Sequence, residues 1–187
     1  MNNLIEHLES HLGLIEGGWK DSDGTRWPFQ VLRFTGGPIA DTVTYSTLGL
    51  SETPLPSAVS CKQVRHELLF MARPAFCDRN IPAVLHQVGI EAIGRGAPYL
   101  RGELIGPRGV LIEGTEMTAL YVSLPVYLPA SFATYQSPDG VSSIFAWLVP
   151  ITSREADFVI ANGWERFEDR LIALNPDLLD LSRTSIV

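Results

Sequence analysis

The strongest constraint on this chain is the segment SIFAWLVPI, because it is apolar on both of the faces that a β-strand presents. Successive side chains of a strand point to opposite sides of its sheet. One alternating set is Ile144, Ala146 and Leu148, and the other is Phe145, Trp147 and Val149. A strand that is apolar on both faces must be buried on both, which favours a place in the middle of a sheet. We therefore predict that residues 142–150 form the central strand.

Four further segments have strand patterns, over residues 29–34, 43–48, 63–73 and 116–124. The third of these is the clearest. Its alternating residues Val64, His66, Leu68, Phe70 and Ala72 share one face, and the residues between them share the other. This pattern is typical of a half-buried strand.

Helical spacing of apolar residues predicts helices over residues 3–12 and 80–93. A third helix starts at the TSRE capping box of Thr152 and Glu155, and a fourth runs from Trp164 to the Asn-Pro pair at 175–176. Residues 16–28, rich in Gly and Asp, are predicted to be a loop. Residues 95–114 are expected to be irregular, and residues 176–187 form a tail without a clear pattern.

These elements predict an α+β fold in which helices pack on a mixed, mainly antiparallel sheet. Strands and helices do not alternate regularly, so a doubly wound nucleotide-binding fold is excluded. We expect the 187 residues to form a single domain.

Charge and targeting signals restrict the function classes. With 14 Lys and Arg against 21 Asp and Glu, the net charge is −7, which argues against a nucleic-acid or anionic-membrane partner. The last two helices carry acidic residues that are predicted to form a solvated face: Glu155, Asp157, Glu165, Glu168 and Asp169. The chain shows no signal peptide and no spanning segment, so we expect a cytoplasmic protein with Cys61 and Cys77 reduced.

Two motifs resemble metal sites. His7 and His11 have the i, i+4 spacing that lets two imidazoles share one metal, but a zincin would have Glu where this chain has Leu8. The favoured interpretation is a pair of half-exposed histidines beside the apolar stripe of the first helix. The sequence DSDG at 21–24 resembles the start of a calcium loop without its later ligands, so a turn is favoured there.

Catalytic motifs are not found. The chain has no GxSxG nucleophile elbow and no phosphate-binding GxxxxGK[ST] loop. His66 is interpreted as a core or interface histidine whose polar groups are satisfied. We therefore predict no catalytic residue, no metal and no cofactor. The alternatives left open are a small-molecule or metal-dependent enzyme that uses His7, His11 or the Asp21 and Asp23 loop, and a self-associating structural subunit.

Three segments resemble the suppressor of fused family. They are DTVTYSTLGLS at 41–51, RHELLFMAR at 65–73 before a proline-started helix, and FAWLVPITSREADFVIANGWERFEDRLI at 145–172. The resemblance covers residues 25–175 in the right order, and is closer to the short bacterial branch than to the longer animal proteins.

The resemblance implies a binding module without catalytic residues or cofactors. Animal members clamp a short peptide as an added strand between two lobes, and this chain resembles the N-terminal lobe alone. Bacterial single-domain relatives are thought to include immunity proteins that neutralise toxin domains. The net charge of −7 suits a basic partner, and it also serves solubility alone.

The resemblance also implies four candidate protein-binding residues. Tyr45, Thr47 and Leu48 lie in the family's YSTLGLS segment, and Glu67 matches the acid of its strand pattern. For Tyr45, a core-facing position is the competing interpretation. The partner, the oligomeric state and the open edge of the sheet are left undetermined.

Overall fold

A mixed β-sheet organises the structure, a computed structural model that describes residues 3–22, 25–57, 62–138 and 140–187. Its main strands follow the order β1 (Gly13–Ser22), β2 (Thr25–Gly36), β3 (Val43–Leu48), β5 (Gln63–Ala72), β9 (Ser142–Thr152), β7 (Met117–Ser123) and β6 (Leu104–Ile105). Two short strands, β4 (Leu55–Pro56) and β8 (Thr134–Gln136), pair with β5 and β9. The pair β5–β9 is parallel and the other pairs are antiparallel. The predicted α+β class with a mixed, mainly antiparallel sheet is confirmed.

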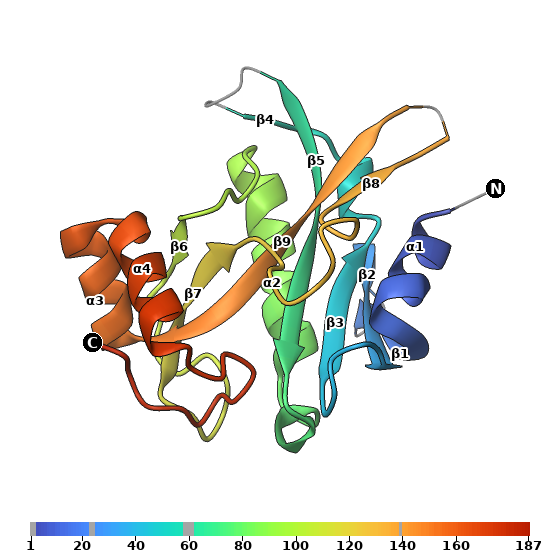
Figure 1. Cartoon of the computed structure of the whole chain (residues 1–187). Helices are drawn as coiled ribbons and strands as arrows, with labels where there is room; N and C mark the ends of the chain where they lie inside the picture. Colours follow the sequence, from blue (N-terminus) through green and yellow to red (C-terminus); the bar gives the residue numbers. More distant parts are fainter. Residues whose placement is uncertain (1–2, 23–24, 58–61, 139) are drawn as a thin grey trace.

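Helices cover both faces of this sheet (Figure 1). They are α1 (Leu4–Leu12), α2 (Ile81–Arg95), α3 (Ser153–Asn162) and α4 (Trp164–Leu174), with 3-10 turns η1 (Leu50–Glu52) and η2 (Pro74–Phe76). The predicted capping box of Thr152 and Glu155 starts α3, and Asn3 with Glu6 forms a second one at α1. Figure 1 shows α2 across one face, with α1 near one end of the sheet and α3 and α4 near the other.

The prediction for residues 142–150 is confirmed, because β9 lies between β5 and β7 and is buried on both faces. Ala146 and Leu148 belong to the core beneath α2, whereas Trp147 and Val149 belong to the core beneath α1, α3 and α4. The strand therefore joins the two halves of the hydrophobic core.

The predicted loop over residues 16–28 is wrong. Most of it belongs to the antiparallel hairpin of β1 and β2, with Trp19 opposite Val31. Register shifts at Ile15/Gly17 and Trp19/Asp21 break the alternation of side chains that would have marked a strand. Asp23, part of the DSDG turn prediction, lies outside the described residues.

The acidic face predicted for the last helices is wrong at Glu155, which is buried. Its carboxylate accepts two hydrogen bonds from Arg183, at 2.6 and 3.1 Å, and the Arg183 side chain is only 6% exposed. Ile186 N–H also donates to this carboxylate, at 3.2 Å. The C-terminal segment, which carries no pattern of its own, is thereby fixed against the start of α3.

Replacing Arg183 should expose the cost of a buried, unpaired carboxylate. We expect Arg183→Met to lower the free energy of unfolding by about 3–5 kcal/mol, measured by urea denaturation at pH 7. The matched control is Arg154→Met, because Arg154 is exposed on α3 and should change stability by less than about 0.5 kcal/mol. Equal unfolding midpoints for the two variants would contradict this role of the ion pair.

His66 is a core histidine, as predicted, but its polar groups are not satisfied as predicted. The side chain is fully buried, and neither ring nitrogen has a hydrogen-bond partner among the described residues. Burial lowers the pKa of His66 to about 4, and the charge of Arg95 adds to this effect. Between a pH of about 4 and 6.5, His66 is therefore mostly neutral in the folded protein and mostly protonated in the unfolded chain.

This shift predicts a loss of stability in acid. Between pH 6.5 and 4 the unfolded state takes up a proton on His66 that the folded state refuses, so stability falls as pH falls. His66→Phe should remove up to about 3 kcal/mol of that loss. Urea unfolding of both proteins at half-unit steps of pH measures the difference, and parallel stability profiles would refute it.

Candidate protein-binding groove

A groove of about 920 Å³ lies between the start of α1, the β1–β2 hairpin and the turn that follows β3. Its lining residues are Asn3, Leu4, Ile5, Lys20, Trp27, Pro28, Phe29, Gln30, Leu48, Gly49, Ser51 and Glu52. Four of them belong to the turn Leu48–Glu52, which comprises the end of β3, Gly49 and the 3-10 helix η1. How that turn is held therefore decides the shape of the groove.

The buried carboxylate of Glu67 holds the turn in place. One oxygen accepts hydrogen bonds from Gly49 N–H at 3.0 Å, Ser51 N–H at 3.1 Å and Ser51 Oγ at 2.7 Å. The other oxygen accepts from Thr47 Oγ1 at 2.5 Å. Gly49 has a φ of +99°, a left-handed conformation that favours glycine. The carboxylate thus satisfies two backbone donors that the turn leaves without a strand partner.

Thr47 marks the point where β3 separates from β5. Regular pairing of these two strands ends at Ser46 and Leu69. The next backbone donor, Leu68 N–H, is taken by Thr47 Oγ1 at 2.8 Å, and the same hydroxyl donates to Glu67. Because a side chain replaces the backbone partner, β3 separates from β5 here without leaving this donor unsatisfied.

Burial dominates the electrostatics of this network. Desolvation raises the pKa of Glu67, while the hydrogen bonds from Thr47, Ser51 and Gly49 act in the opposite direction. Arg65 contributes from the same strand, since its Nη1 donates to the Ser51 carbonyl at 3.0 Å. The turn is consequently held by β5 through both a carboxylate and a guanidinium.

The four predicted contact residues occupy three different environments. Leu48 lines the groove and is partly exposed. Thr47 and Glu67 are buried behind the turn. Tyr45 lies in the core near α2, where its hydroxyl donates to the Cys77 carbonyl at 2.8 Å and burial raises its pKa to about 12. The side chain of Tyr45 therefore faces the core, as the competing interpretation has it. Contact of a partner with any of the four residues stays a prediction.

Sequence reasoning missed the aromatic wall that β2 supplies. Trp27 stacks on His86 of α2 with ring centroids 3.6 Å apart, and Phe29 packs against Gly89. A Cβ atom at Gly89 would lie 2.3 Å from the Phe29 ring, so this position in the helix needs glycine. The sequence WPF was a signal, but it was divided between the predicted loop, which ends at Pro28, and the predicted strand, which begins at Phe29.

The same chain segments match a known family. A family model described as suppressor of fused protein matches residues 25–184. This chain belongs to the suppressor of fused family. The match includes β2, the Leu48–Glu52 turn and Glu67, and it confirms the predicted resemblance.

Solved suppressor of fused structures have the same fold at low sequence identity. A homologue from Neisseria gonorrhoeae has 19% identity and a TM-score of 0.77, with 98% of this chain and 94% of the homologue covered. The Sufu-Fu complex has 14% identity and a TM-score of 0.72, covering 98% and 90%. Drosophila Suppressor of Fused has 13% identity and a TM-score of 0.63 over 87% of this chain, which spans only 44% of that protein.

Two further findings are negative. A search of curated proteins found no match. Within the described residues, none of the helices has the length and apolar character needed to cross a membrane. Eukaryotic suppressor of fused proteins bind partner proteins.

His7 and His11 contact the loop before β8 in this suppressor of fused domain. His7 Nε2 lies 3.2 Å from the Phe132 carbonyl, and His11 Nε2 lies 3.1 Å from Ser131 Oγ. Burial lowers the pKa of His7. In the described part of the chain, no three His, Cys, Asp or Glu side chains are grouped as a metal site would require. Both histidines attach α1 to the loop.

The Glu67 network yields a stability prediction. Glu67→Gln keeps the shape of the side chain but places an amide N–H₂ among donors, so at least one donor loses its acceptor. We expect the free energy of unfolding to fall by about 2–3 kcal/mol. The control Glu52→Gln, at an exposed position of the same turn, should be nearly neutral. Chemical denaturation measures both, and a neutral Glu67→Gln would contradict the role assigned to the carboxylate.

Proposed function

We propose that this suppressor of fused protein is a non-enzymatic, single-domain binding protein that captures a segment of another protein in the groove. The observation that carries the proposal is the groove of about 920 Å³, one wall of which is a turn built around Glu67. The relative solved as the Sufu-Fu complex binds a partner protein, which supports the same class of function here.

The lining of the groove suits a polypeptide. Trp27, Leu48 and Ile5 offer apolar contact, and the exposed side chain of Gln30 can pair with a peptide backbone. Lys20 and Glu52 supply one charge of each sign. Leu48 is the direct contact, Thr47 and Glu67 support the turn from behind, and Tyr45 supports β3 from the core near α2.

We propose further that the partner is a toxin domain and that the protein acts as an immunity protein in the bacterial cytoplasm. The resemblance to the short bacterial branch motivates this. The net charge of −7 supports a basic partner, because complementary charge accelerates association. An acidic protein that binds and covers a basic toxin domain needs no catalytic group of its own.

The experiment identifies the partner first and then tests the groove. Crosslinking in the native cell, followed by mass spectrometry, names the candidates. Calorimetry with the purified partner then gives the affinity of wild type and of Leu48→Arg. We expect Leu48→Arg to weaken binding at least about tenfold, because it places a charge in an apolar contact. The control is Val110→Arg, at a position 63% exposed and outside the groove.

A second variant and an activity assay make the test decisive. Glu52→Lys, at an exposed position, should slow association with a basic partner without altering the fold. Co-expression should protect cells from the toxicity of that partner. A partner whose affinity is unchanged in both Leu48→Arg and Glu52→Lys would refute the groove, and a partner without toxicity would refute the immunity role.

A further inference from the structure

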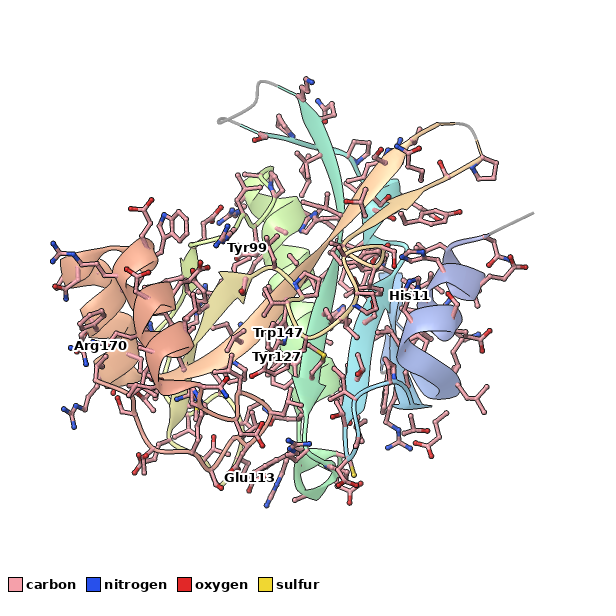
Figure 2. The ribbon with its side chains drawn as sticks, viewed as in Figure 1. His11, Tyr99, Glu113, Tyr127, Trp147 and Arg170 are labelled. Carbon is pink, nitrogen blue, oxygen red and sulfur yellow. The ribbon has the colours of Figure 1, made fainter. Side chains whose placement is uncertain are left out.

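A second hollow, of about 260 Å³, lies at β9 and α4, whereas the groove lies at α1 and the β1–β3 end of the sheet. The two hollows share no residue. The second hollow is enclosed by β9, by α4 and the residues that follow it, and by the segment after β7. The apolar side chains that line it are Val126, Tyr127, Trp147, Val149, Leu171, Ile172, Pro176 and Leu178. Figure 2 shows Trp147 and Tyr127 close together in front of the sheet. We call this hollow the Trp147 cavity.

Trp147, one of the residues that line the cavity, carries a buried donor without a partner among the described residues. Its side chain is fully buried, and its indole N–H has no acceptor among the described residues. A buried donor without a partner costs about 1–3 kcal/mol. The Tyr127 ring covers the indole with centroids 5.0 Å apart, yet Tyr127 is 37% exposed. The Tyr127 hydroxyl also donates to the Pro176 carbonyl at 3.4 Å, so a ligand reaches the indole only when the Tyr127 ring is displaced.

The charged residues of the cavity are already paired with each other. Arg101 and Glu168 form an ion pair, and the Tyr121 hydroxyl donates to Glu168 at 2.7 Å. Because the carboxylate balances the guanidinium, the pair does not call for a charged ligand. The cavity therefore combines apolar walls, the polar side chains of Ser123 and Asn175, and an indole N–H that has no acceptor among the described residues.

We propose that the Trp147 cavity binds a neutral small molecule made of a single ring with one acceptor oxygen, which receives the hydrogen bond of the Trp147 indole. The volume fits a single ring with a few further atoms, since sites for larger ligands are typically about 300–1,000 Å³. This function is separate from capture of a protein segment in the groove.

Two ring compounds of the same shape test whether the ligand needs an acceptor oxygen. Acetophenone carries a carbonyl oxygen where α-methylstyrene carries a CH₂ group. The chain has four tryptophans, so a ¹⁵N-labelled sample gives four indole resonances, and Trp147→Phe identifies the one of interest. We expect acetophenone to shift the Trp147 indole proton downfield with saturation and to bind at least about tenfold more tightly than α-methylstyrene.

Variants locate the effect. In Trp147→Phe the preference for acetophenone over α-methylstyrene should fall to about one, whereas the control Trp19→Phe should preserve it. Leu48→Arg in the groove should leave acetophenone binding unchanged, so that failure of the groove proposal and failure of this one are distinguishable. If Trp147→Phe does not fold, the affinities of the wild-type protein for the two ligands still decide whether the acceptor oxygen contributes to binding.

Three results would overturn the proposal. They are the absence of a saturable shift at Trp147, equal affinity for the two ring compounds, and tighter binding of N-acetylphenylalaninamide than of acetophenone. The last result would assign the cavity to a side chain of a partner polypeptide instead of a free small molecule.

Discussion

The parallel pair β5–β9 is the constraint on which the rest of the structure depends. Both strands carry buried apolar side chains on both faces, so each face of the sheet needs a cover. Parallel strands also require a long connection, and here it includes α2, which packs on one face. The other face is covered by α1, α3 and α4, which lie outside that connection, together with Leu128, Phe132 and Tyr135 from within it.

Two buried carboxylates fix the segments that leave this central pair. Glu67 on β5 is satisfied by hydroxyls and backbone N–H groups, whereas Glu155 at the start of α3 is satisfied by Arg183 as well. The first holds the turn that forms a wall of the groove. The second attaches the C-terminal segment, whose Leu178 lines the Trp147 cavity. Each hollow therefore depends on a carboxylate that itself lies outside the lining.

Local patterns allowed most of the fold to be predicted from the sequence. The central strand, the helices and the Thr152 cap depend on neighbours within about four residues, which periodicity detects. The β1–β2 hairpin escaped because its bulges interrupt the alternation. The candidate site was only partly predictable, because its contacts join residues far apart in the sequence. Glu67 accepts a hydrogen bond from Thr47, 20 residues away, and Trp27 of β2 stacks on His86 of α2. Such contacts carry no periodic signal.

The two hollows differ in the chemistry that they can recognise. The groove is large and mixes aromatic, amide and charged side chains from several elements, so recognition there is spread over many weak contacts. The Trp147 cavity is smaller, its charged residues are paired with each other, and its walls include an indole N–H without an acceptor among the described residues. A binding protein of this kind needs no catalytic motif, because shape and a few oriented donors select the ligand. This is why a search for catalytic patterns in the sequence passes over both places.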